Sequence, residues 1–133
     1  MEKIGFNIET ITAIALLITI LAQIYVHIRV ARYTLFVEYT KRYQDLMFHF
    51  PEKWDDVTSL NNELKRYLCV YFDLCSEEYF LKKKGYLNRV VWKEWVEGME
   101  STFSENIIKD YWQECKSGYP NFSKFVEDKI LNK

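Results

Sequence analysis

The chain has 133 residues, enough for one small domain, and a net charge of −1 that does not indicate nucleic-acid binding as a primary role. Its three cysteines form no Cys-x-x-Cys pair and have no histidine partner, so we expect neither a metal site nor a cofactor. We interpret Cys69, Cys75 and Cys115 as small buried hydrophobic residues.

The amino-terminal part contains an uncharged, strongly apolar run from Thr10 to Ile28. Nineteen helical residues span about 30 Å, the thickness of the hydrocarbon core of a bilayer. A cleaved signal would have a shorter apolar core and a basic leader, and this chain has neither. We therefore predict a transmembrane helix at residues 10–30, a short extracytoplasmic amino terminus at residues 1–9 and a cytoplasmic domain at residues 31–133.

The charges beside this run predict its orientation. Lys3 is the only basic residue on the amino side, whereas Arg29, Arg32, Lys41 and Arg42 follow the run within about 15 residues. We predict that the amino terminus is outside and the carboxyl terminus is inside. Arg29 and Arg32 are expected to contact anionic lipid.

One side of the predicted transmembrane helix carries small residues, and polar residues continue that side toward the cytoplasm. Lipid gives a lone helix no reason to carry such a stripe, whereas packing against a second helix does. We predict an oligomer interface there, with two pore-lining candidates beside it. The alternative is that the histidine lies at the membrane interface and reaches toward headgroups. The interface residues are Thr12, Ala15, Thr19 and Ala22, and the pore-lining candidates are Gln23 and His27.

Beyond the membrane the chain is predicted to be all-α: the transmembrane helix continues into a long cytoplasmic helix that packs with about four further helices. No glycine or proline occurs between Gly5 and Pro51, so the first helix is expected to reach about His49. Its emergent half carries a heptad-like seam that packs either on the chain's own helices or on a neighbouring copy. The seam residues are Tyr33, Phe36, Thr40, Tyr43, Met47 and Phe50.

Apolar spacing near 3.6 residues predicts the remaining helices at about 59–84, 89–101, 104–116 and from 121 onward. Gly85 is expected to cap the first of these, while Asn88, Ser104 and Asn121 are expected to begin the others. The run Lys82-Lys83-Lys84 is interpreted as a solvated last turn, with anionic lipid or RNA as alternative contacts. We interpret four carboxylates as a solvated face: Glu77, Glu78, Glu94 and Glu97.

Arg42 and His49 are the only pair of catalytic type. They lie seven residues apart, and therefore nearly on the same face of a helix. This spacing resembles the Arg-x(4–6)-His pattern of HEPN ribonucleases, in which histidine transfers a proton and arginine balances phosphate charge. The spacing also arises by chance, so we expect no enzyme and keep a tethered ribonuclease as an alternative.

Two further resemblances concern larger parts of the chain, and the first covers roughly residues 25–130. The stretch Leu74–Leu81, the glycine at Gly85 and the pair Trp92-x-x-Trp95 resemble small bacterial single-pass proteins with a helical cytoplasmic domain. The overall plan is similar to the pore-forming membrane accessory protein of type VI-B CRISPR systems, which carries a HEPN-like helical domain. This resemblance implies the bacterial inner membrane as location and a ring-shaped pore in antiviral defence.

The sequence therefore predicts a self-associating, non-enzymatic single-pass membrane effector. Its expected partners are the lipid bilayer, other copies of the chain and a cytoplasmic protein, but not nucleic acid. The alternatives are the tethered ribonuclease and a non-enzymatic adaptor that recruits a partner to the membrane.

Overall fold

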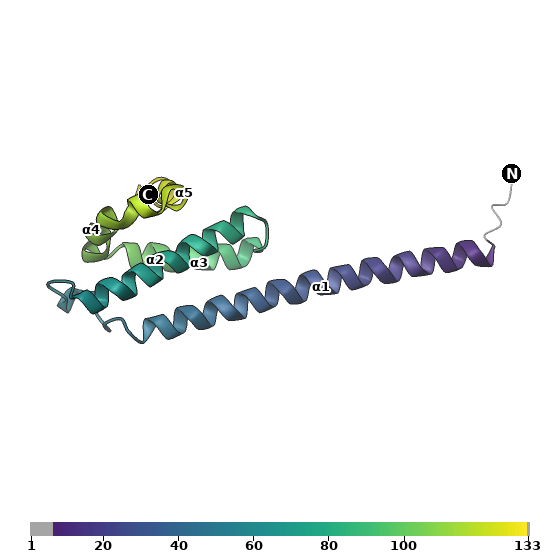
Figure 1. The fold of residues 1–133 in the computed structure, drawn as a ribbon, viewed down its shortest axis with the longest axis horizontal. Helices are drawn as coiled ribbons and strands as arrows, with labels where there is room; N and C mark the ends of the chain where they lie inside the picture. The colour runs from purple at the N-terminus through teal and green to yellow at the C-terminus, as the bar shows by residue number, and fades with distance from the viewer. Residues whose placement is uncertain (1–6, 133) are drawn as a thin grey trace. The chain divides into compact units, whose positions relative to one another are not determined.

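The computed structural model describes residues 7–132 and shows an all-α fold within them, as predicted (Figure 1). Its α-helices are α1 (Ile8–Met47), α2 (Asn62–Lys83), α3 (Arg89–Phe103), α4 (Asn106–Cys115) and α5 (Pro120–Phe125). Short 3₁₀ turns η1 (Trp54–Asp56) and η2 (Lys116–Gly118) precede α2 and α5, and a π-helical segment η3 (Val126–Leu131) follows α5.

Helix α1 is 40 residues long because nothing in its sequence interrupts it. Asn7 lies just before its first turn, where the side-chain oxygen accepts a hydrogen bond from the Thr10 amide at 2.8 Å. The helix ends at Met47, two residues earlier than predicted, and tight turns through His49 and Phe50 lead to Pro51. Of the predicted extracytoplasmic terminus, residues 1–6 lie outside the described residues.

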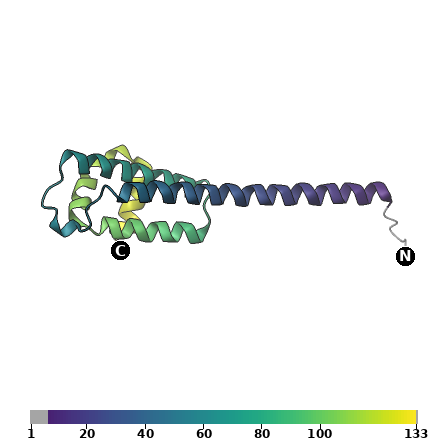
Figure 2. The same ribbon diagram turned by 90° about the horizontal axis from the view of Figure 1, so that it is seen from below.

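The chain divides into two compact units between Leu35 and Phe36, and α1 contributes to both. In the second unit, the last part of α1 packs against both α2 and α3, and Figure 2 shows these three helices running alongside one another. Tyr39 packs on Trp95 of α3 with ring centroids 5.7 Å apart, and Arg42 pairs with Glu77 of α2. The bundle therefore includes the end of α1, as the seam predicted.

The buried side of α1 is nevertheless wider than the predicted seam. Tyr43 and Met47 pack against the core as expected, but the most buried residues of α1 are Tyr39 and Leu46, which the seam omitted. Tyr33, the first seam residue, is 69% exposed. A helix contacting two others needs an apolar stripe wider than the two positions per heptad of a coiled coil.

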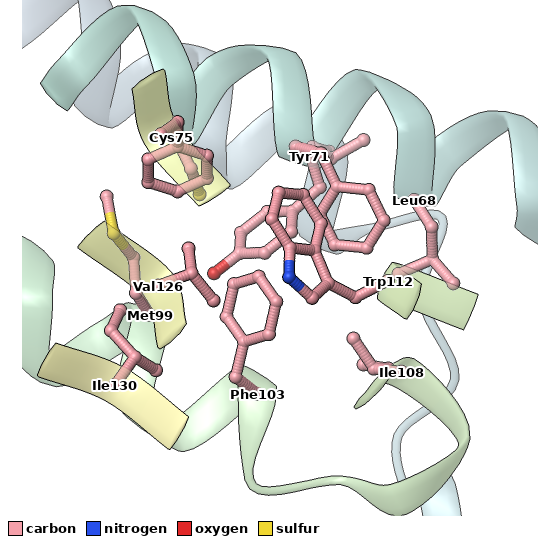
Figure 3. Close-up of a cluster of buried hydrophobic side chains, with 12 residues drawn as sticks. Leu68, Tyr71, Cys75, Met99, Phe103, Ile108, Trp112, Val126 and Ile130 are labelled. Atoms are coloured by element: carbon pink, nitrogen blue, oxygen red, sulfur yellow. The ribbon is translucent and has the colours of Figure 1, made fainter. Parts of the chain in front are cut away.

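Aromatic side chains form the centre of the second unit. Trp112 of α4 is fully buried and lies beside Phe103 (Figure 3). Its ring contacts Phe72, Phe103 and Phe122 at centroid distances of 4.9, 5.4 and 5.7 Å. These rings come from four different helices. Burial of each such side chain contributes roughly 1.5–3 kcal/mol, so this contact joins α2, α3, α4 and α5 into one core.

Helix boundaries follow their caps. Asn88 accepts a hydrogen bond from the Val91 amide at 2.8 Å and begins α3, and Gly85 has φ +77° just after α2, both as predicted. The predicted cap at Ser104 is wrong. Its hydroxyl instead donates to the Ser101 carbonyl at 2.6 Å, so it closes α3, and Glu105 precedes α4.

Candidate functional site

The first candidate region is the apolar part of α1. Every side chain from residue 7 to residue 34 is exposed, including eleven large aliphatic residues between Ile8 and Ile28. This part of α1 is long and apolar enough to cross a membrane. The buried core of the chain begins only at Tyr39.

Both threonines of the predicted interface are satisfied within the helix. The Thr12 hydroxyl donates to the Ile8 carbonyl and the Thr19 hydroxyl donates to the Ala15 carbonyl, each at 2.9 Å. Such bonds to the residue four earlier leave only methyl groups and small surface pointing outward. With Ala15 and Ala22, these threonines form a shallow exposed strip along α1.

Gln23 lies beside this strip, roughly 60° round the helix from its centre by helical spacing. Among residues 7–132 its amide makes no hydrogen bond with another side chain, and it is exposed. His27 is one turn further and is also exposed. The strip, Gln23 and His27 remain predictions as interface and pore-lining residues, since the structure contains one chain.

The two arginines expected at the lipid surface follow on the same helix. The Arg29 guanidinium lies 5.7 Å from the centre of the Tyr25 ring, and its Nη1 is 3.5 Å from the Tyr25 hydroxyl. Arg32 is also exposed. A tyrosine and an arginine one turn apart are suited to the boundary between hydrocarbon and headgroups.

Arg42 and His49 have separate environments. Arg42 Nη1 donates to Glu77 Oε2 at 2.7 Å, and the guanidinium lies 5.0 Å from the Tyr39 ring. His49 stacks on Tyr67 at 4.1 Å, beyond the end of α1. Within residues 7–132 no hydrogen bond joins Arg42 to His49, and the ribonuclease alternative stays a prediction.

The ion pair with Arg42 lowers the pKa of Glu77. Hydrogen bonds from Arg42 and from the Tyr39 hydroxyl, at 2.7 and 3.0 Å, hold the pKa of this carboxyl below its usual range. Burial and the hydrogen bond to Glu77 raise the pKa of Tyr39 to about 12. The carboxylate and guanidinium are both close to half exposed, so the pair contributes little to stability, about 0–1 kcal/mol.

The prediction of a solvated carboxylate face is wrong for Glu78. Glu77, Glu94 and Glu97 are exposed, but only 6% of Glu78 is accessible. Burial raises the pKa of Glu78 to about 8. The burial of Glu78 could have been predicted from its spacing, because it follows Tyr71 and Cys75 on the buried side of α2. The expectation of exposure to solvent depended on residue type alone.

The remaining predicted features are the three cysteines and the lysine run at the end of α2. Cys75 is buried, while Cys69 and Cys115 are half-buried, and Cys69 Sγ lies 3.4 Å from the Tyr111 hydroxyl. The lysine run ends α2, with Lys83 and Lys84 over the rings of Tyr79 and Phe80. These contacts fit a solvated last turn.

No protein-family model matches the chain, and neither the curated proteins nor the solved structures contain a match to it. The class defined by the fold is therefore a helical domain preceded by a helix that can span a membrane.

Proposed function

We propose that this chain is a single-pass membrane effector that self-associates through its first helix and forms a pore or membrane-perturbing ring. The observation that carries the proposal is the unpartnered amide of Gln23 within an exposed apolar helix. In hydrocarbon an amide without a hydrogen bond is costly, and a second copy of the helix supplies the missing donor and acceptor.

The small strip beside Gln23 lets that second copy approach closely. Because the hydroxyls of Thr12 and Thr19 are bonded within their own helix, two strips meet without burying an unsatisfied polar group. Gln23 then hydrogen-bonds at the edge of the contact, and His27 faces the path enclosed by several copies. Polar residues in membranes face bundle interiors or water-filled cavities for the same reason.

Charge supports the orientation of the proposed span. Arg29 and Arg32, followed by Lys41 and Arg42, lie on its carboxyl side. We propose that this side faces the cytoplasm of a bacterial cell, with the chain in the inner membrane. The helical domain then holds the assembly together and receives a signal from a cytoplasmic protein. The antiviral role is supported by the architectural resemblance alone.

Substitutions that change the size of the strip test this proposal. Ala15→Leu and Ala22→Leu separate the helices, and Gln23→Leu removes an interhelical hydrogen bond worth about 1 kcal/mol, or roughly fivefold in association. Ala13→Leu adds the same volume on the other side of α1 and is the matched control. The measurement is light scattering after size-exclusion chromatography of the full chain in mild detergent.

We expect the unmodified chain and the Ala13 variant to form oligomers of one size, and the strip variants to form smaller species. A monomeric unmodified chain overturns the proposal. If the Ala13 and Ala15 variants behave alike, the interface lies on another face of α1.

A further inference from the structure

A cavity of about 250 Å³ lies between α1, α2 and α3, entirely within residues 36–133. Helix α1 lines it near Tyr43, α2 lines it near Glu78, and α3 lines it near Trp95. An apolar cavity of about 150 Å³ can hold a benzene molecule, so this cavity has room for a small organic ligand.

The cavity has a buried floor and an open side. Tyr71, Leu74, Cys75 and Met99 line it and are buried. Phe36, Thr40, Trp95 and Gly98 also line it but are partly accessible, and Glu94 at its edge is exposed. A ligand can therefore enter from solvent and reach the buried side chains without unfolding the bundle.

Glu78 is the carboxyl group of this buried side. It is 94% buried by accessible area, and within residues 7–132 it makes no hydrogen bond or ion pair. Arg42, the cation that influences it, is already paired with Glu77. Besides Glu78, the ionisable groups that line the cavity or interact with the charge of Glu78 are Arg42, Tyr43, Tyr71, Cys75, Glu77 and Glu94.

Four of the eleven residues that line the cavity are aromatic. Phe36, Tyr43, Tyr71 and Trp95 all line the cavity. Trp95 also packs against Tyr39, which does not line the cavity and whose ring centroid is 5.7 Å away. The faces of such rings attract cations, most strongly where water is excluded. Rings and a carboxylate around one cavity are complementary to positive charge.

We propose that this cavity binds a small organic ammonium cation, with its charge against Glu78 and the aromatic rings and its carbon groups against Leu74 and Met99. Ammonium groups surrounded by aromatic side chains are bound in this way in other proteins. The proposal does not depend on self-association in the membrane.

Binding of such a cation is coupled to release of a proton. With a pKa of about 8, Glu78 is mostly neutral at pH 7 and mostly ionised at pH 9. A permanent cation binds the ionised form, so its affinity increases about tenfold between these pH values. Burial raises the pKa values of Tyr43 and Cys75, which keeps both neutral over most of this range, and Glu77 stays ionised beside Arg42.

Choline and its uncharged carbon isostere, 3,3-dimethylbutan-1-ol, are the probes that test the proposal. Binding to the full chain in dodecyl maltoside is measured by isothermal titration calorimetry at pH 7, 8 and 9. We expect choline to bind at least tenfold more tightly than the isostere at pH 8, and more tightly at pH 9 than at pH 7. Equal binding of the two probes, or no binding of choline, overturns the proposal.

Glu78→Gln removes the charge and keeps the shape, and we expect it to weaken choline binding at least tenfold and to abolish the pH dependence. Glu97→Gln is the matched control, because Glu97 is exposed on α3, lies 3.8 Å from Lys93 and does not line the cavity. Unchanged binding in the Glu78 variant overturns the assignment.

Gly98→Leu tests the cavity without changing its charge. A Cβ at this position has no atom within 4 Å, and leucine favours a helix more than glycine does, so the variant is expected to fold. Loss of choline binding supports the proposal, and unchanged binding overturns it. Short-chain phosphatidylcholine below its micellar concentration distinguishes two sources: tighter binding than choline identifies a lipid headgroup, and weaker binding identifies a free cation.

Discussion

Glu78 shows how one residue can make the stability of the helical domain depend on pH. The unfolded chain ionises a glutamate near pH 4.5, whereas the folded chain keeps Glu78 protonated until about pH 8. The folded state therefore binds one more proton between these values. This favours folding at low pH and is lost as the pH rises to about 8.

Replacement of Glu78 by glutamine should remove this dependence. We expect the melting temperature of the unmodified chain to fall between pH 5 and pH 8, because its stability decreases by up to about 1.4 kcal/mol per pH unit. The Glu78→Gln variant should melt higher at pH 8 and change little with pH, as measured by tryptophan fluorescence of the full chain in detergent. The Glu97→Gln control should follow the unmodified chain. Parallel curves for all three proteins would show that Glu78 ionises normally.

At the scale of the element, two neighbouring helix ends differ in how they are capped. Asn88 accepts a hydrogen bond from the amide of Val91, whereas Ser104 donates to a carbonyl of α3 and caps nothing in α4. Asn88→Ala should lower the free energy of unfolding by about 1 kcal/mol. Ser104→Ala should lower it by less, since an exposed hydroxyl is lost and no helix amide loses its partner.

Urea unfolding of both variants, followed by far-ultraviolet circular dichroism, measures this difference. Asn61→Ala is a second test of the same kind, because Asn61 accepts a hydrogen bond from the Leu64 amide at 2.8 Å at the start of α2. If Ser104→Ala proves as costly as the asparagine substitutions, the hydroxyl has a structural role beyond its bond to Ser101.

These elements also show what the sequence can and cannot predict. Helical periodicity predicted the number and type of the main helices, because burial on one side of a helix leaves a repeating apolar pattern. Helix ends were less certain, since Asn, Ser and Glu all occur near them and the chain used only some of the candidates. The π-helical segment after Phe125, which contacts α3, has no marker in the sequence.

Of the two candidate sites, one could be predicted from the sequence and the other could not. The apolar part of α1 was evident from composition, because few soluble segments keep so many residues without a charge. The cavity was not, since it is formed by Tyr43, Glu78 and Trp95 on three helices that are distant in the sequence. A buried carboxylate contradicts the usual preference of glutamate for solvent, so residue type gave the wrong environment for Glu78.

At the scale of the whole molecule, the two units have different sources of stability. Every residue of the buried core cluster lies at or after Leu46, whereas the exposed apolar residues of α1 between Ile8 and Val30 belong to the first unit. In water the hydrophobic effect favours burial of the apolar core of the second unit. The same effect disfavours exposure of the apolar side chains of the first unit. The second unit is therefore expected to need no lipid.

A fragment of residues 36–133 separates these contributions. We expect it to be soluble without detergent, to unfold cooperatively and to be monomeric by light scattering, while the full chain requires detergent and forms oligomers. Trp112→Ala should destabilise the fragment by roughly 3–5 kcal/mol, because this side chain contacts rings from three other helices. A fragment that forms the same oligomer as the full chain would place self-association in the helical domain and leave α1 as an anchor only. An unfolded fragment would show that the core needs the first 35 residues for its stability.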